Sequence, residues 1–301
     1  MLLLSPQPTM HGSSQGVGLQ WSYLSAQGAV TSGEVDAEHL PDLVERHPSW
    51  FATPDRIAVV LTGEEIVHLN VSVPGRSVNS IRQALPFAVE EFITSDVEDV
   101  HIAYQSIRPN QPVHCSVINT ARLDFWLSLL SGSGVTPGAV VSQAQLIRPN
   151  ANEAALLFEA DQVVVVTEDQ DALIDRDVVP DILDTLDVAS LTCIGGSLTD
   201  LELGQLSTAP TLNIIETSPM QYLLERLSPT GGGLVSHPNL LNSLQGSYAV
   251  RYEDSSLDAA WRRTLAIAAV WFLVLVGAMS LQGIWLENQT NQINTKNFKT
   301  Y

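Results

Sequence analysis

The chain has 301 residues, of which 45% are hydrophobic and 16% charged, a balance typical of a folded protein and not of a disordered one. Residues 1–260 hold 10 arginines, no lysine and 32 acidic residues, so their net charge is 10 − 32 = −22. A surface this acidic repels a phosphate backbone, which argues against nucleic-acid binding as the main role. Because lysine is missing, this part of the chain also has no P-loop lysine, no Schiff-base lysine and no kinase-type phosphate lysine.

Cysteine usage and the first residues indicate a compartment. Cys115 and Cys193 form neither a CxxC pair nor a metal-binding framework, and nothing indicates a disulfide-stapled secreted domain. Residues 1–4 are apolar but lack the basic leader and the long apolar core of a secretory signal peptide. We therefore expect a reduced, cytosolic soluble part whose N-terminus stays inside the cell.

The first predicted elements are three strands, at residues 17–24, 57–62 and 65–73, where apolar residues alternate or run continuously. Residues 62–64, with the sequence Thr-Gly-Glu, predict a hairpin turn between the last two strands. The Pro-Gly pair at 74–75 then ends the sheet.

A helix is predicted after these strands, because Ser77 is a suitable N-cap and apolar residues follow at helical spacing. Pro86 is expected to kink this helix or to start a second one. In the second part we expect Phe87, Val89 and Phe92 in the core, beside an acidic edge. The predicted partner-binding residues combine Phe87 with this edge: Phe87, Glu90, Glu91, Asp96, Glu98 and Asp99. A solvated acidic face without a partner is the alternative.

Strands are predicted next at 100–106 and 113–118, followed by a helix at 120–131. The residues expected to point inward from this helix are Phe125, Trp126, Leu129 and Leu130.

A second round of the same element order begins near residue 153. Its predicted elements are strands at 154–159, 162–167 and 171–174, a short helix at 179–186 and a strand at 190–194. The repeated order of strands and helices predicts two related α/β lobes. We place the first lobe at 1–150, the second at 151–250 and a tether to the membrane at 251–263.

Residues 264–286 form the most distinctive segment, a run of 23 residues without a charge. At about 1.5 Å per residue a helix of this length spans roughly 34 Å, enough for a bilayer core. Arg262 and Arg263 precede the run and Glu287 follows it, which predicts a single-pass helix with a cytoplasmic N-terminal part. Residues 287–301 would then begin a periplasmic segment, whose folded domain is absent or truncated.

Small residues are grouped on one side of this predicted helix. At about 100° per residue they fall within an arc of roughly 120°, which would let another helix approach closely. These residues are Ala266, Ala269, Gly277, Ser280 and Gly283. The ordinary composition of membrane spans is an equally good explanation.

No sequence motif supports a catalytic role for this chain. Residues 12–16 match the GxSxG spelling, but a strand follows this segment where the motif needs a helix. Residues 194–197 (Ile-Gly-Gly-Ser) follow a strand and could contact a phosphate, although such a turn needs glycine for backbone reasons alone. His39 and His47 lie about 12 Å apart on a helix, too far for one metal ion. We predict no catalytic residue, no cofactor and no metal.

Two segments carry a family resemblance. Residues 73–104 (VPGRSVNSIRQALPFAVEEFITSDVEDVHIAY) resemble the R-x-AL-P-F, EE and D-h-H pattern of the type II secretion system protein L family. Residues 239–248 (NLLNSLQGSY) resemble the NLLQG-x-Y segment that this family places shortly before its single membrane helix. The matching residues of the first segment are Arg82, Ala84, Leu85, Pro86, Phe87, Glu90, Glu91, Asp99 and His101.

The resemblance implies a two-lobed actin-like (ribonuclease H-like) cytoplasmic module followed by one transmembrane helix. It also implies a non-enzymatic inner-membrane platform subunit that recruits the secretion ATPase, protein E, and pairs with protein M, with protein F and a second copy of the chain as further partners. Actin-like ATPases carry an acidic turn near the first strand, and residues 16–19 contain no such acid. The alternatives are a membrane-tethered actin-like nucleotide-binding protein, with Gly195 and Gly196 at the nucleotide, and a type IV pilus assembly subunit.

Overall fold

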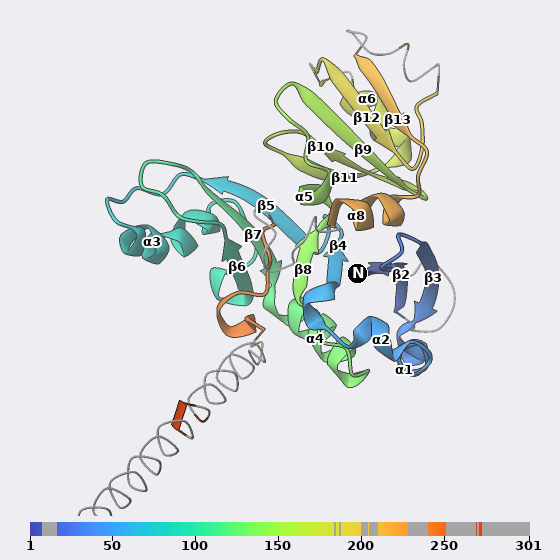
Figure 1. Ribbon diagram of the computed structural model, residues 1–301. Coiled ribbons are helices and arrows are strands. Elements are labelled where there is room, and N and C mark those ends of the chain that lie inside the picture. Colours follow the sequence, from blue (N-terminus) through green and yellow to red (C-terminus); the bar gives the residue numbers. More distant parts are fainter. Residues whose placement is uncertain are drawn as a thin grey trace, which may run out of the picture. The chain divides into compact units, whose positions relative to one another are not determined.

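A computed structural model describes residues 1–7, 17–183, 185–186, 188–199, 204, 210–227, 240–250, 269 and 271–272. The chain divides into two compact units, residues 1–250 and 251–301. The first unit holds all the sheets (Figure 1).

The first lobe is built on a five-stranded sheet with the order β3-β2-β1-β4-β8. Its strands are β1 (Leu2–Gln7), β2 (Gly18–Leu24), β3 (Val30–Asp36), β4 (Ile57–Leu61) and β8 (Ala139–Ser142). The first three strands form an antiparallel meander, whereas β4 pairs parallel to β1 and β8 parallel to β4. The apolar start of the chain is therefore a central strand, with Leu2, Leu3 and Leu4 fully buried.

Helices cover one face of this sheet, where they bury a core that includes Leu40, Leu123 and Trp126. These elements are η1 (Ala37–His39), α1 (Leu40–Arg46), α2 (Pro48–Phe51), η2 (Pro54–Arg56) and α4 (Thr120–Gly132). On α4, Trp126 and Leu130 point inward as predicted, but Phe125 is 39% exposed. The expectation for Phe125 was wrong because the apolar residues of α4 outnumber the positions that face the sheet.

A three-stranded sheet with its own helix is inserted between β4 and α4. Its order is β5-β7-β6, and it comprises β5 (Ile66–Val71), β6 (Val100–Tyr104), β7 (Val113–Asn119), α3 (Val78–Glu90) and η3 (Val97–Asp99). The predicted hairpin at 62–64 is wrong, because β4 and β5 belong to different sheets. This turn crosses between them, and the Glu65 carboxylate accepts hydrogen bonds from Arg122 and Trp126 on α4.

The second lobe has another five-stranded sheet, with the order β11-β10-β9-β12-β13. It comprises β9 (Glu153–Glu159), β10 (Gln162–Val166), β11 (Asp171–Asp175), β12 (Ser190–Ile194), β13 (Thr211–Ile215), η4 (Arg176–Val178) and α6 (Val179–Leu183). As in the first lobe, three strands form an antiparallel meander and two more pair in parallel. The strand topology is thus repeated, with β1 to β4 and β8 matching β9 to β13.

Two helices lie between the large sheets, α5 (Gln143–Ile147) and α8 (Pro219–Leu227) (Figure 1). Leu146 and Leu223 join one core with Val60 from the first sheet and Leu157 from the second. This shared core fixes the two lobes to each other, because separating them would expose apolar surface on both.

The last described part of the first unit is residues 240–250, which include η6 (Gly246–Tyr248) and are called the strap below. Ala269, Trp271 and Phe272 of the second unit are exposed, and each is assigned to a helix. The remainder of the predicted span 264–286 lies outside the described residues, as do Arg262 and Arg263. Among the residues described, no helix has the length and apolar character needed to cross a membrane.

Candidate partner-binding surface

The outer face of α3 carries an exposed aromatic side chain about one helical turn before two carboxylates. Ser77 caps the helix by accepting a hydrogen bond from the backbone N–H of Ser80, at 3.2 Å. The buried face of α3 packs on the inserted sheet through Ile81, Leu85 and Val89. With about 3.6 residues per turn, Phe87 falls opposite this face, and its side chain is 69% exposed.

The expectation that Phe87 and Phe92 belong to the core is wrong. Only Val89 of the three apolar residues is buried, and Phe92 is 59% exposed just beyond the helix. Pro86 lies within a single helix and starts no second one. The sequence window after Pro86 holds more large apolar residues than the one buried face can cover, so the excess faces solvent.

The acidic residues predicted with Phe87 are exposed as well. Glu90 and Glu91 lie at the end of α3. Asp96 precedes η3, and Glu98 and Asp99 belong to it. Exposed apolar side chains and exposed acidic residues thus follow one another along this part of the chain, which we call the α3 surface: Phe87, Glu90, Glu91, Phe92, Asp96, Glu98 and Asp99. An exposed aromatic group with an acidic rim suits a partner surface that is apolar at its centre and basic around it.

The two segments that carried the resemblance meet in the structure. His101 on β6 lies with its Nε2 atom 2.7 Å from the carbonyl oxygen of Ser243 in the strap. Its ring also stands edge-on to Tyr248, with the ring centres 4.8 Å apart. Burial lowers the pKa of His101, and the hydrogen bond to Ser243 opposes this effect. Neutral His101 therefore donates through Nε2.

The strap closes the edges of two sheets. At the edge of β8, the Asn242 side chain accepts a hydrogen bond from the Val140 N–H at 3.0 Å, and the Ser243 N–H donates to the Val140 carbonyl at 2.8 Å. At the edge of β6, the Gln245 amide both accepts from and donates to the Tyr104 backbone. Tyr248 donates to Asp124 on α4 at 2.7 Å. The strap therefore ties the inserted sheet to the first lobe immediately before the second unit begins.

The glycine turn after β12 is filled by the protein itself. Gly195 has a φ of +72°, and a Cβ atom there would lie 2.6 Å from Pro219. At Gly196 a Cβ atom would lie 2.6 Å from the Phe158 ring. The absence of side chains at this turn is thus explained by close packing on Phe158 and Pro219. Residues 8–16, which follow β1 and include the GxSxG spelling, lie outside the described residues.

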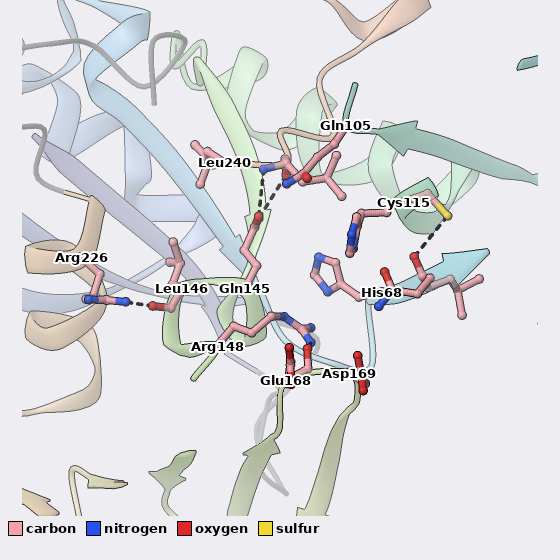
Figure 2. A pocket seen from close by; sticks show the side chains of 14 residues that line it. His68, Gln105, Cys115, Gln145, Leu146, Arg148, Glu168, Asp169, Arg226 and Leu240 are labelled. Atoms are coloured by element: carbon pink, nitrogen blue, oxygen red, sulfur yellow. Dashed lines mark hydrogen bonds between the residues drawn. The ribbon is translucent and has the colours of Figure 1, made fainter. Parts of the chain in front are cut away.

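A cavity of about 520 Å³ lies where the inserted sheet meets the second lobe. Figure 2 shows His68 and Cys115 on one side of it and Arg226 and Leu146 on the other. The Nδ1 atom of His68 lies 3.9 Å from Asp171, which also pairs with Arg148 at 2.7 Å. Both imidazole nitrogens of His68 are buried without a hydrogen-bond partner in the described part of the chain. The sequence does not reveal this site, because its lining comes from seven separate stretches of the chain.

Other predicted residues do not form a site in the described regions. His39 ends η1, whereas His47 lies between α1 and α2 and stacks on Trp50 with ring centres 3.9 Å apart. The described residues contain no group of three or more His, Cys, Asp or Glu side chains arranged to hold a metal ion. Of the predicted stripe of small residues, only Ala269 is among the residues described.

Comparison with known protein families identifies the family to which this chain is similar. The family model for type II secretion system (T2SS), protein L matches residues 11–227, more than half of the chain. The chain belongs to the protein L family. The resemblance predicted from the sequence is thereby confirmed.

Two curated relatives are both described as type II secretion system protein L. The protein from Dickeya chrysanthemi is 26% identical over 136 residues, which are 45% of this chain and 32% of that protein. The protein from Pseudomonas aeruginosa (strain PAO1) is 30% identical over 95 residues, which are 32% of this chain and 24% of that protein. The matched segments thus span about a third or less of either relative.

A solved structure shows the same fold. The cytoplasmic domain of EpsL, an inner membrane component of the type II secretion system of Vibrio cholerae, superimposes with a TM-score of 0.57 at 22% identity. The match covers 82% of this chain and 100% of that domain. The PilM–PilN type IV pilus biogenesis complex matches 75% of this chain and 96% of the compared chain at 14% identity, with a TM-score of 0.49. The match to the EpsL domain confirms the predicted actin-like fold of two α/β lobes for this chain.

Proposed function

We propose that this chain is a non-enzymatic platform component of the type II secretion system in the bacterial inner membrane. Membership of the protein L family is the observation that carries the proposal. The uncharged run at 264–286, preceded by Arg262 and Arg263, supports a single-pass helix with lobes 1–150 and 151–250 in the cytoplasm, a tether at 251–263 and the C-terminus in the periplasm.

The platform recruits the secretion ATPase, protein E, through the α3 surface. Phe87 supplies an apolar anchor that is 69% exposed, and Glu90 and Glu91 stand next to it. A free monomer leaves such an aromatic group in water at a cost, which burial in a partner removes. The surrounding carboxylates favour the approach of a basic partner surface and disfavour an acidic one.

In the membrane the chain pairs with protein M through the stripe Ala266, Ala269, Gly277, Ser280 and Gly283. Small residues let two helix backbones approach closely, which is the main source of helix association in lipid. Protein F and a second copy of the chain are further partners of the same platform.

The test is capture of protein E by the full chain in detergent micelles. We expect the full chain to retain protein E from the same organism, and the double variant Glu90→Arg/Glu91→Arg to lose it at low salt. The matched control is Asp42→Arg/Glu45→Arg. It reverses two acidic residues on α1, a helix that packs on the five-stranded sheet of the first lobe and not on the inserted sheet. Equal capture by both double variants, or no capture by the unaltered chain, would contradict the proposal.

A further inference from the structure

β13 is the outermost strand of the second-lobe sheet, and most of its residues are exposed (Figure 1). Among the described strands it pairs only with β12. The exposed residues are consecutive: Thr211, Leu212, Asn213 and Ile214. Because successive side chains of a strand point to opposite faces, both faces of β13 are accessible to solvent. An open strand edge carries unpaired N–H and C=O groups that can accept another strand.

The four outer edges of the two large sheets differ in their protection. β3 carries Glu34 and Asp36, and β11 begins and ends with aspartate. β8 is covered by the strap. β13 has the sequence Thr-Leu-Asn-Ile-Ile, which contains neither a charge nor a proline. Charged side chains, proline and a covering segment are the usual means by which a strand edge resists pairing, and β13 shows none of them in the described part of the chain.

The hydrogen bonds to β12 identify which backbone groups of β13 point outward. The Thr211 N–H donates to the Ala189 carbonyl at 2.9 Å, and the Ile215 carbonyl accepts from the residue after β12 at 3.1 Å. Thr211 and Ile215 therefore direct their backbone groups toward β12. Since successive residues of a strand bond to alternate sides, Leu212 and Ile214 direct their N–H and C=O groups outward.

This outward edge is complementary to itself. When two copies of β13 pair antiparallel about a two-fold axis at Asn213, Leu212 of each copy lies opposite Ile214 of the other, and both are hydrogen-bonded pairs. The two aliphatic side chains, 36% and 51% exposed in one copy, then pack against each other on one face of the joined sheet. Glu216, the first acid after the strand, falls opposite Pro210 of the other copy and not opposite another acid.

Charge also favours a second copy as the partner at this strand. Acidic residues greatly outnumber basic ones in residues 1–260, so two copies repel each other over most of their surfaces. An uncharged strand is a place where the two can meet without opposing like charges. It offers no carboxylate to a basic partner, in contrast to the α3 surface.

We propose that two copies of this chain associate through β13, which joins their second-lobe sheets into one continuous sheet. One strand from each copy makes a small contact, which is weak between free molecules. The membrane helix proposed above raises the local concentration of the copies and so favours the pairing. The interface shares no residue with the α3 surface, so its failure in the test below leaves the recruitment of protein E unaffected.

The test is disulfide cross-linking of the full chain in detergent micelles under mild oxidation. In the proposed pairing the two Asn213 Cα atoms form a non-hydrogen-bonded pair about 4.5 Å apart, a distance that a disulfide spans. The two Thr211 Cα atoms lie about 14 Å apart at about 3.4 Å per residue, which is too far. We expect Asn213→Cys to give at least about tenfold more covalent dimer than Thr211→Cys. The native Cys115 and Cys193 are buried and serve as an internal background.

Two further measurements test the backbone pairing. Hydrogen exchange of the unaltered chain should show protection at the amides of Leu212 and Ile214 that increases with protein concentration. Ile214→Pro removes an outward N–H, a change that edge strands tolerate, and should abolish cross-linking when combined with Asn213→Cys. Ile214→Val keeps this N–H and is the matched control.

Three results would overturn the proposal. The first is equal cross-linking of Asn213→Cys and Thr211→Cys. The second is exchange at Leu212 and Ile214 that does not depend on concentration. The third is cross-linking of Asn213→Cys in cells to a different protein alone, which would assign the strand to another partner.

Discussion

His101 and Ser243 lie 142 residues apart in the sequence, and the imidazole Nε2 of one is 2.7 Å from the carbonyl oxygen of the other. The contact joins β6 of the inserted sheet to the strap, which is the last described part of the first unit before the predicted membrane segment. Ser243 also places its hydroxyl 3.3 Å from that of Ser116 on β7. The strap therefore contacts the inserted sheet at both β6 and β7, and the other face of that sheet carries α3.

Removing this contact should loosen the strap. His101→Leu deletes the hydrogen bond to Ser243 and the ring contact with Tyr248, and we expect a loss of about 1–3 kcal/mol in the free energy of unfolding. The loss should appear as a lower melting temperature and faster proteolysis within residues 240–250. His114→Leu is the matched control, because His114 is an exposed histidine of the same sheet. Equal effects of the two substitutions would show that the strap contact does not stabilise the fold.

The sequence predicted the two lobes but aligned them wrongly. Residues 17–24, 57–62 and 65–73 were expected to match the three-stranded meander of the second lobe, whereas the true counterparts are β1, β2 and β3. β1 was missed because its apolar part is only three or four residues long and Pro6 follows. β3 was missed because its residues are mostly polar and partly exposed, as befits an edge strand.

The candidate surface was predicted in part, for a physical reason. Acidic residues rarely enter a core without a partner, so the exposure of Glu90 and Glu91 followed from their chemistry. Exposure of Phe87 did not follow, because hydrophobicity alone predicts burial and only the position of the sheet decides which helix face is covered. The cavity beside His68 could not be predicted, because only the tertiary fold brings its separate stretches of chain together.

Acid should destabilise the first unit through His68. Burial lowers the pKa of His68 to about 4, with Asp171 opposing and Arg148 adding to this effect. Because the unfolded chain binds the proton more readily, stability is complete above the ordinary pKa of 6.5 and falls as pH drops toward 4. At about 1.4 kcal/mol per pKa unit the loss approaches about 3 kcal/mol.

The measurement for His68 is the melting temperature of the full chain between pH 7 and 4, compared with that of His68→Gln. Glutamine is neutral at every pH, so the melting temperature of the variant lacks the contribution that protonation of His68 makes to its pH dependence. We expect the unaltered chain to lose more stability than the variant over this range. Parallel curves would contradict the assignment.

The α3 surface predicts two different effects on binding to protein E. Phe87→Ser should raise the dissociation rate, with little dependence on salt, because it removes an apolar anchor. Glu90→Arg/Glu91→Arg should lower the association rate, most strongly at low ionic strength, since rim charges act on the encounter. Val78→Ser, an exposed apolar residue at the start of the same helix, is the control. Surface plasmon resonance at two salt concentrations separates the two rates, and unchanged rates at low salt would exclude this surface.

Nucleotide should not bind at the glycine turn. Phe158 and Pro219 occupy the space beside Gly196 and Gly195 that a ligand would need for close backbone approach. No lysine is available before residue 296 to hold a phosphate. We expect calorimetry of the full chain with Mg²⁺ and ATP to show no saturable heat. A dissociation constant below about 10 μM, or about −7 kcal/mol, would make the chain a nucleotide-binding protein.

The stripe of small residues predicts where the membrane partner packs. In lipid no hydrophobic force draws helices together, so close approach of the backbones at Gly277 must supply the contact. Gly277→Leu should therefore lower the cross-linking yield with protein M, or with a second copy of the chain, by more than about tenfold. Trp271→Leu lies opposite the middle of the stripe at about 100° per residue and should leave the yield unchanged. Both variants keep the run uncharged, so insertion and orientation, governed by Arg262 and Arg263, should be the same. Equal cross-linking yields in native membranes would show that the stripe reflects composition and forms no interface.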